Sequence, residues 1–194
     1  MKRLFDIVVS FIMLLLLVIP FGIISLIIML DDGCPAIFKQ YRVGKDNKLF
    51  YIYKFRTMRK DTRNTAKGEL AESDECITKI GRILRKTSID ELPQIINVLR
   101  GEMSFVGPRP LIPEEKEIRV LRQKYNVYSV KPGLTGLAQV YGRDALDDDA
   151  KAELDKKYVD EQSLLLDLKI LFRTVYVVLK RENVIEGSEK VNTR

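Results

Sequence analysis

The chain contains no histidine, and its 194 residues include only two cysteines, Cys34 and Cys76. Without histidine it cannot form a Ser-His or Cys-His nucleophile pair or a histidine-based metal site. Two cysteines without a CxxC spacing indicate neither a disulfide framework nor a zinc site, and they fit a reducing, cytoplasmic setting. Any chemistry must therefore rest on carboxylates, lysine, arginine, tyrosine or hydroxyl groups.

One long segment lacks charge altogether. The 24 residues from Ile7 to Leu30 are uncharged, and as a helix they would reach about 36 Å, enough to cross a hydrocarbon core of about 30 Å. The run is longer than the apolar region of a signal peptide, and Asp31 to Pro35 lack a small-x-small cleavage site. We therefore expect the segment to be retained.

Pro20 lies near the middle of this segment, where a proline removes one helical hydrogen bond and bends the axis. Basic residues flank the segment on both sides: Lys2, Arg3, Lys39, Arg42, Lys45 and Lys48. A bent helix that enters and leaves the membrane on one face would place both basic flanks on the same side. The alternative, which the residues alone favour, is an ordinary kinked span.

The rest of the chain is polar, and the whole carries a formal net charge of +6 with a pI near 9.2. Such a charge suits an anionic membrane surface or a phosphorylated substrate. The basic residues are interspersed with acids and no nucleic-acid motif occurs, so we expect no nucleic-acid partner.

The pattern of apolar residues predicts a mainly α-helical fold with a small β-hairpin. Ile37–Val43 and Leu49–Arg56 alternate around the turn-forming residues 44–47. The polar run from Arg59 to Glu75 is expected to be a mobile loop, and 131–136 a turn. Three later helices are expected, the last amphipathic and either interfacial or part of the core: about Pro113 to Tyr125, Ala145 to Glu161 and Leu164 to Leu179.

The segment Ser88-Ile89-Asp90-Glu91-Leu92 places two adjacent carboxylates where a helix should begin. Pro93 is tolerated only in a first helical turn, so the helix should start near residues 88 to 91. The unpaired N–H groups and dipole of such an end favour carboxylates and bound phosphate. The structural alternative is a capping box in which Ser88 pairs with Glu91.

Three arginines lie in constrained settings. Arg85 precedes Asp90 by one to two helical turns, Arg109 lies between two prolines, and Arg143 follows a glycine. The planar guanidinium group donates two parallel hydrogen bonds to a phosphate and stays charged. A phosphate site would require all three arginines to converge on Asp90.

Five motifs, in this order and spacing, resemble the bacterial sugar transferases, which are monotopic polyprenyl-phosphate phosphoglycosyl transferases. The likeness covers nearly the whole chain, and the long central motif is the most specific. The motifs are YKFRTM at 53–58, SIDELPQ at 88–94, NVLRGEMSFVGPRP at 97–110, KPGLTG at 131–136 and DLK at 167–169.

The resemblance implies transfer of a sugar 1-phosphate from a UDP-sugar to undecaprenyl phosphate, with release of UMP. This reaction initiates assembly of a capsule, exopolysaccharide or glycoprotein glycan at the cytoplasmic face of the bacterial plasma membrane. Asp90 would be the nucleophile, forming a covalent phosphosugar, and would lie near Mg²⁺, with Glu91 as its dyad partner.

The other site residues are also assigned by this resemblance. Arg85, Arg109 and Arg143 match positions expected to hold phosphate or nucleotide, while Lys54 and Asp167 match supporting residues near the site. Downstream glycosyltransferases are expected as further partners. Two different functions remain as alternatives: a membrane-bound glycosyltransferase that releases UDP, and a non-catalytic membrane scaffold for glycan assembly.

The resemblance also implies a re-entrant first helix broken at Pro20, in place of the kinked span. Residues 1–33 would then be the re-entrant membrane helix. Residues 34–194 would form a cytoplasmic catalytic domain packed on the membrane surface, with interfacial amphipathic helices contacting phospholipids. The chain departs from some relatives at Ile19, where they have serine, and at Leu137, where tryptophan is frequent.

Overall fold

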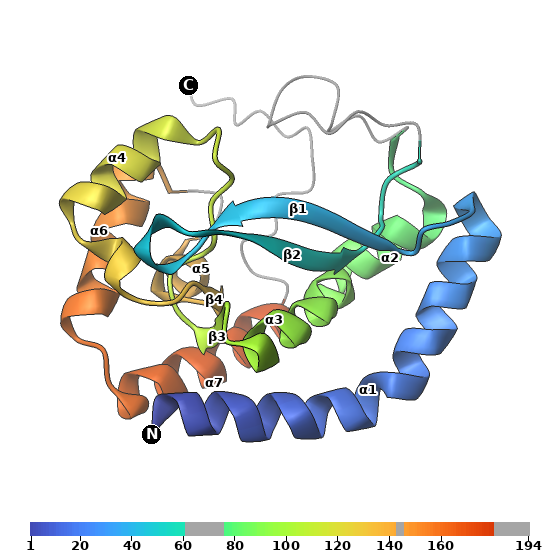
Figure 1. The fold of residues 1–194 in the computed structure, drawn as a ribbon, viewed down its shortest axis with the longest axis horizontal. Helices are drawn as coiled ribbons and strands as arrows, with labels where there is room; N and C mark the ends of the chain where they lie inside the picture. The colour runs from blue at the N-terminus through green and yellow to red at the C-terminus, as the bar shows by residue number, and fades with distance from the viewer. Residues whose placement is uncertain (61–75, 143–145, 181–194) are drawn as a thin grey trace.

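The computed structural model describes residues 1–60, 76–142 and 146–180 (Figure 1). The described part is mainly helical with two small sheets, which confirms the predicted mainly α fold with a hairpin. The α-helices are α1 (Lys2–Asp32), α2 (Lys79–Lys86), α3 (Ile95–Arg100), α4 (Lys116–Lys124), α5 (Leu137–Tyr141), α6 (Asp148–Asp160) and α7 (Leu164–Lys180). Short 3-10 segments are η1 (Lys45–Asn47), η3 (Ile89–Gln94) and η4 (Val127–Ser129).

The helix α1 changes direction partway along its length (Figure 1). Pro20 lies inside it, and its missing N–H and its ring are a sufficient cause of a bend. Inward-facing residues from Phe5 to Leu17 pack against the main core, around Ile95 and Phe105. Those after Pro20, from Phe21 to Met29, pack against a second cluster around Phe55 and Leu84. The two halves of α1 therefore contact different parts of the same body.

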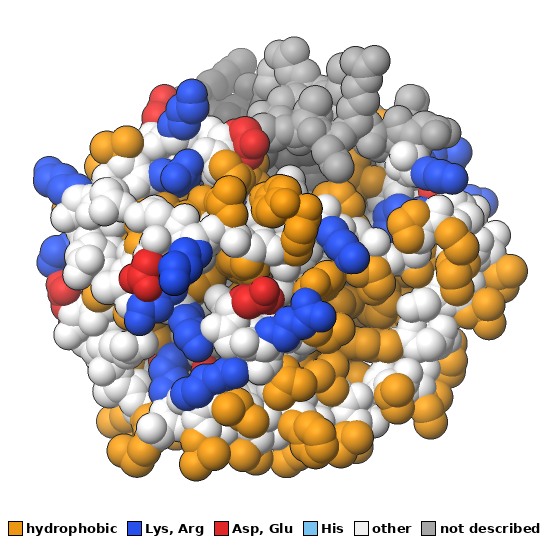
Figure 2. Space-filling model, viewed as in Figure 1, with side chains coloured by type: hydrophobic (Ala, Val, Ile, Leu, Met, Phe, Trp, Pro, Cys, Tyr) orange, Lys and Arg blue, Asp and Glu red, His pale blue; other side chains and the backbone are white. Residues whose placement is uncertain are grey.

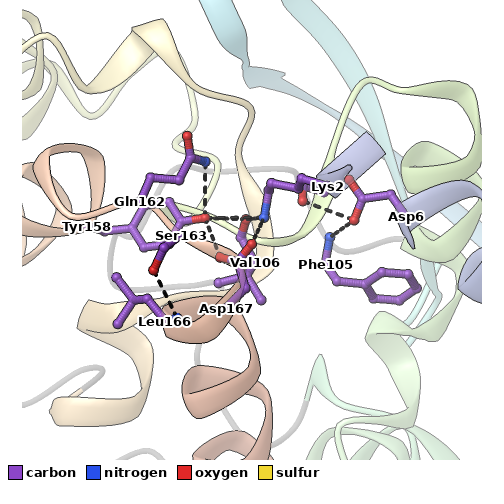
Figure 3. Close-up of polar contacts among 10 residues, drawn as sticks. Lys2, Asp6, Phe105, Val106, Tyr158, Gln162, Ser163, Leu166 and Asp167 are labelled. Carbon is purple, nitrogen blue, oxygen red and sulfur yellow. Dashed lines mark hydrogen bonds and ion pairs between the residues drawn. The ribbon is translucent and has the colours of Figure 1, made fainter. Parts of the chain in front are cut away.

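Polar contacts attach the first turn of α1 to the rest of the chain (Figure 3). The Lys2 Nζ donates to the Asp167 carboxylate at 2.6 Å, to the Tyr158 hydroxyl at 3.2 Å and to the Val106 carbonyl at 3.0 Å. The Tyr158 hydroxyl in turn donates to Asp167 at 2.8 Å. Burial of the Tyr158 ring raises the pKa of its hydroxyl, so it remains a donor.

The last turn of α1 is attached as well, by an arginine that follows the hairpin. The Arg56 NH2 donates to the Asp32 carbonyl at 2.9 Å and to the Gly33 carbonyl at 2.6 Å, and lies 3.3 Å from the Asp32 carboxylate. Arg56 is buried, so water competes little for these bonds. Both ends of α1 are thus held by the same body.

The predicted hairpin is confirmed to within one residue. β1 (Ile37–Val43) and β2 (Leu49–Phe55) pair antiparallel, with Ile37 opposite Phe55 and Val43 opposite Leu49. The second sheet was not expected: β3 (Ser104–Val106) and β4 (Gly133–Thr135) pair in parallel where only a turn was predicted. A Cβ on Gly133 would lie 2.1 Å from the Gly107 backbone nitrogen, so this close pairing requires glycine.

Three of the later helices fall close to their predicted positions. α4 begins at Lys116 rather than near Pro113, α6 spans Asp148–Asp160, and α7 begins at Leu164 as expected. Ala145, the predicted start of the second, lies outside the described residues, as does most of the predicted loop from Arg59 to Glu75.

Exposed apolar side chains occur on both α1 and α7, and α1 runs along one edge of the molecule (Figure 1). Hydrophobic side chains line that edge in the space-filling view (Figure 2). α7 buries Ile170 and Val177 yet leaves Phe172 76% exposed, so it is not an ordinary core helix with a polar outer face. The exposed apolar residues include Leu4, Phe11, Leu15, Leu16 and Ile19 of α1 and Leu165, Leu168, Phe172 and Val175 of α7.

Candidate active site

The two adjacent carboxylates lie on the short turn η3. Ser88 takes a left-handed conformation (φ 56°, ψ 17°), and the chain turns helical at Ile89, as expected. The form differs from the prediction, because η3 is a 3-10 turn and the α-helix α3 begins only at Ile95. Pro93 contributes to this, because it has no N–H to donate an α-helical hydrogen bond to the Ile89 carbonyl.

The capping-box alternative is wrong. The Ser88 side chain makes no capping hydrogen bond. The Glu91 carboxylate is directed elsewhere: its Oε1 lies 2.7 Å from the Lys54 Nζ and 3.7 Å from NH1 of Arg109. Lys54 comes from β2 and Arg109 from the segment after β3, so η3 lies where three distant parts of the chain meet.

Asp90 is placed in an environment that opposes its negative charge. Burial, followed by the neighbouring Glu91 charge, raises the pKa of Asp90 from its ordinary 3.8 to about 6. The positive charges of Lys54 and Arg85 act in the opposite direction but do not cancel this effect. A carboxylate with a raised pKa is a stronger base and a stronger nucleophile, and such perturbed groups gather at active sites.

Arg85 is the predicted arginine whose positive charge acts on Asp90. It lies in the last turn of α2, and its Nε donates to the Thr57 hydroxyl at 2.9 Å. Thr57 is buried, so this bond anchors the Arg85 guanidinium group at Nε, while Arg85 as a whole remains exposed. Arg85 can therefore reach toward an anion bound beside Asp90.

A shallow depression that opens to solvent adjoins the Glu91 carboxylate. Its lining includes Lys54 and Arg109 and adds Arg42 and Gln139, which the sequence did not identify as site residues. Burial and the nearby Arg109 charge lower the pKa of Arg42 to about 10. Two guanidinium groups this close repel one another, and an anion between them would relieve that repulsion.

A signal for Arg42 exists in the sequence once the hairpin is accepted. In the observed register Lys54 is opposite Phe38, and Arg42 is four residues from Phe38 on the same strand. Side chains an even number apart share one face of a strand. Arg42 and Lys54 therefore lie on the same face of the hairpin.

One other predicted residue, Asp167, is not part of this cluster. Asp167 lies in the network with Lys2 and Tyr158 at the start of α1 (Figure 3), and its contacts are with those residues rather than with η3. Arg143 lies outside the described residues.

No group of three or more metal-binding side chains occurs in the described part of the chain. Mg²⁺ nevertheless binds commonly through one or two carboxylates, with water and substrate phosphates completing the shell. Glu91 lines the basic depression, and Asp90 is its neighbour on η3, so this pair of carboxylates fits that mode of binding.

Comparison with known proteins places this geometry in context. A family model described as bacterial sugar transferase matches residues 1–181. An "uncharacterized sugar transferase EpsL" of Bacillus subtilis is 45% identical over 99% of this chain and 92% of its own length. The "undecaprenyl-phosphate galactose phosphotransferase" of Salmonella typhimurium is 43% identical over 94% of this chain. The "UDP-glucose:undecaprenyl-phosphate glucose-1-phosphate transferase" of Escherichia coli is 40% identical over 91% of it.

The relatives differ in how much of their own length is matched. The chain spans only 41% of the Salmonella protein and 39% of the Escherichia protein. Both matches nevertheless extend over nine-tenths or more of this chain.

Proposed function

The chain belongs to the bacterial sugar transferase family, and from this we propose that it transfers a sugar 1-phosphate from a UDP-sugar to undecaprenyl phosphate and releases UMP. The observation that carries the proposal is the Asp90–Glu91 pair on η3, beside a depression lined by Arg42, Lys54 and Arg109. A diphosphate needs such cationic side chains, and its phosphorus needs a nucleophile next to them.

In the proposed reaction the Asp90 carboxylate attacks the phosphorus next to the sugar. A bond forms between the Asp90 oxygen and that phosphorus, and the bond to the bridging diphosphate oxygen breaks, so UMP leaves with both electrons. An oxygen of undecaprenyl phosphate then attacks the same phosphorus and releases Asp90 as a carboxylate. Two successive displacements at phosphorus, with Asp90 as the intermediate carrier, avoid a direct encounter between the two anionic substrates.

Arginine and lysine side chains hold the charge that develops on the leaving phosphate. Arg109 is well suited to this, since its side chain is 43% exposed and lies 3.7 Å from Glu91, too far for a tight bond. Arg85 approaches Asp90 from α2, and we assign Arg143 to nucleotide or phosphate binding as well. Lys54 supports the site by holding Glu91 in place beside Asp90.

We further propose that Asp90 and Glu91 bind Mg²⁺ together with the diphosphate. The ion would neutralise charge on the diphosphate and improve the leaving group. Glu91 has a second role in this proposal, because its charge keeps the Asp90 carboxylate basic.

The arrangement of α1 supports a monotopic, re-entrant attachment to the membrane. α1 is long and apolar enough to cross a bilayer. Lys2 at its start and Asp32 at its end are both bound to the same folded body, through Asp167 and Arg56. One body cannot lie on both sides of a membrane, so we infer that α1 dips in and returns at Pro20, with α7 lying in the interface.

We propose that residues 34–194 lie on the cytoplasmic face of the plasma membrane, because UDP-sugars are made on that side. The phosphate of undecaprenyl phosphate lies at headgroup level, within reach of a site held at the surface. Downstream glycosyltransferases would then receive the lipid-linked product.

The test is nucleotide release by the purified full chain in detergent, with undecaprenyl phosphate and Mg²⁺. UDP-galactose and UDP-glucose are the first donors, because the names of two relatives specify those sugars. Asp90→Asn keeps the shape of the side chain but removes the nucleophile. Asp160→Asn is the matched control, since Asp160 forms an exposed ion pair with Lys156 on α6.

UMP release that persists in Asp160→Asn and is lost in Asp90→Asn is the expected result. Release of UDP instead would identify a glycosyltransferase that moves the sugar alone. No nucleotide from any UDP-hexose, together with full biological effect of Asp90→Asn, would identify a non-catalytic scaffold.

A further inference from the structure

The backbone around Arg109 is held by hydrogen bonds that its carbonyl groups accept from other parts of the chain. Pro108 and Pro110 have no N–H, so this segment cannot form an ordinary ladder of hydrogen bonds. Its three successive carbonyls accept instead: that of Pro108 from the Gly133 backbone at 2.9 Å, and that of Arg109 from NH1 of Arg122 at 2.7 Å. The carbonyl of Pro110 lies 3.4 Å from NH1 of Arg42. The position of Arg109 therefore depends on side chains from other elements.

Arg122 is an unusual residue to find in this role, because it is only 3% exposed. It lies on α4, and its NH2 forms an ion pair with Asp155, which lies on α6 and is 1% exposed. Burial raises the pKa of Asp155, and the Arg122 charge opposes that rise. The pair thus links α6, through α4, to the carbonyl of Arg109.

A buried ion pair is weak evidence of a stabilising role. Removing two charges from water costs several kcal/mol, roughly what their attraction returns, and apolar residues of similar volume often serve as well. The apolar contacts between α4 and α6, among Ile118, Leu121 and Ala152, already hold these helices together. What apolar residues could not supply is the donor to the Arg109 carbonyl.

We propose that Arg122 and Asp155 are positioning residues that fix the backbone of Arg109, so that its guanidinium group meets the substrate phosphate. Asp155 acts through Arg122, by orienting its fork so that NH2 faces the carboxylate and NH1 faces the carbonyl. Neither residue touches the substrate. The proposal rests on the proposed function, since it takes Arg109 to bind a phosphate.

The experiment measures UDP binding by calorimetry, using the full chain in detergent with Mg²⁺. UDP carries the diphosphate and requires neither acceptor nor turnover. Arg122→Met combined with Asp155→Leu replaces the buried pair by apolar residues, which preserves packing while removing the donor. The matched control is Lys156→Met with Asp160→Leu, which removes an exposed ion pair from the same helix α6.

The apolar double variant should keep its melting temperature and lose about tenfold in UDP affinity, as expected for a misplaced charge-assisted contact. The control should bind UDP like the wild type. In a chain that already carries Arg109→Ala, the apolar pair should cause less than about a twofold further loss, because the residue that it positions is gone.

Unchanged UDP affinity in the apolar double variant would overturn the proposal, and so would an equal loss with and without Arg109. Absence of UDP binding by the wild type would overturn it too. Nucleotide release in the donor assay is judged separately. A chain that binds UDP with the expected coupling, yet releases no UMP, would retain this inference while the proposed function fails.

Discussion

Asp90→Asn should make the protein more stable while abolishing its activity. Burial and the Glu91 charge raise the pKa of Asp90 from 3.8 to about 6. Each pH unit of that difference corresponds to about 1.4 kcal/mol, which gives roughly 3 kcal/mol against the charged form. Asp90 keeps some contact with solvent, so we reduce this to about 2 kcal/mol. Asparagine removes that cost and keeps the shape.

The sign of the effect depends on pH in a defined way. Below about pH 3 the aspartate is protonated in both the folded and the unfolded chain, and the variant should match the wild type. Between pH 4 and 6 the unfolded chain loses its proton first, so the stability of the wild type falls relative to the variant. Above about pH 6.5 the difference should be constant, at roughly 4–8 °C in melting temperature.

The assay is thermal unfolding of both proteins in the same detergent across pH 4 to 8, with Asp160→Asn as a control expected to show no plateau. Nucleotide release is measured on the same preparations. A variant that melts at or below the wild-type temperature at pH 7.5 would refute the view that Asp90 is held charged in an unfavourable place. Retained turnover would refute its role as nucleophile.

Three further outcomes follow from the contacts. Lys54→Met removes a positive charge near Asp90, so the acidic limb of the pH profile of kcat/KM should move to higher pH; an unmoved limb would contradict this. Asp167→Asn weakens the pair with Lys2 and should lower the melting temperature by roughly 4–8 °C, for a loss of about 2 kcal/mol, while UDP affinity stays unchanged. Pro20→Ala should straighten α1. In a chain lacking Cys76, an impermeant thiol reagent should label Cys34 from the cytoplasmic side in the wild type and from the opposite side in the variant; identical labelling would show that Pro20 does not decide topology.

Local patterns were sufficient for much of the fold. The hairpin was predicted to within one residue, since alternation along seven-residue strands is a strong signal. The parallel pair β3 and β4 was missed for two reasons: three-residue strands carry no readable alternation, and the partners Ser104 and Gly133 are far apart in the chain. The form of η3 was missed because helical spacing does not distinguish a 3-10 turn from the first turn of an α-helix.

The site was predictable where motifs name residues and hidden where tertiary structure assembles them. Asp90, Glu91, Lys54, Arg85 and Arg109 were identified in advance, and the structure brings them together around η3. Arg122 and Asp155 lie on helices that were predicted, but neither residue was identified as part of the site. The sequence of a charged helix does not show which of its charged residues will be buried, because that depends on how the helices pack. A buried ion pair is therefore not predictable from the sequence pattern.

Different groups contact the backbone and the side chain of Arg109. The backbone is fixed by Arg122 at 2.7 Å, whereas the guanidinium group is exposed and only loosely paired with Glu91. Lys54, at 2.7 Å, can hold Glu91 alone. A phosphate in the depression could therefore draw the Arg109 side chain from Glu91 without moving the main chain. Such a transfer would leave the Glu91 charge less compensated, which would raise the pKa of Asp90 further and make its carboxylate, when ionised, a stronger nucleophile toward phosphorus.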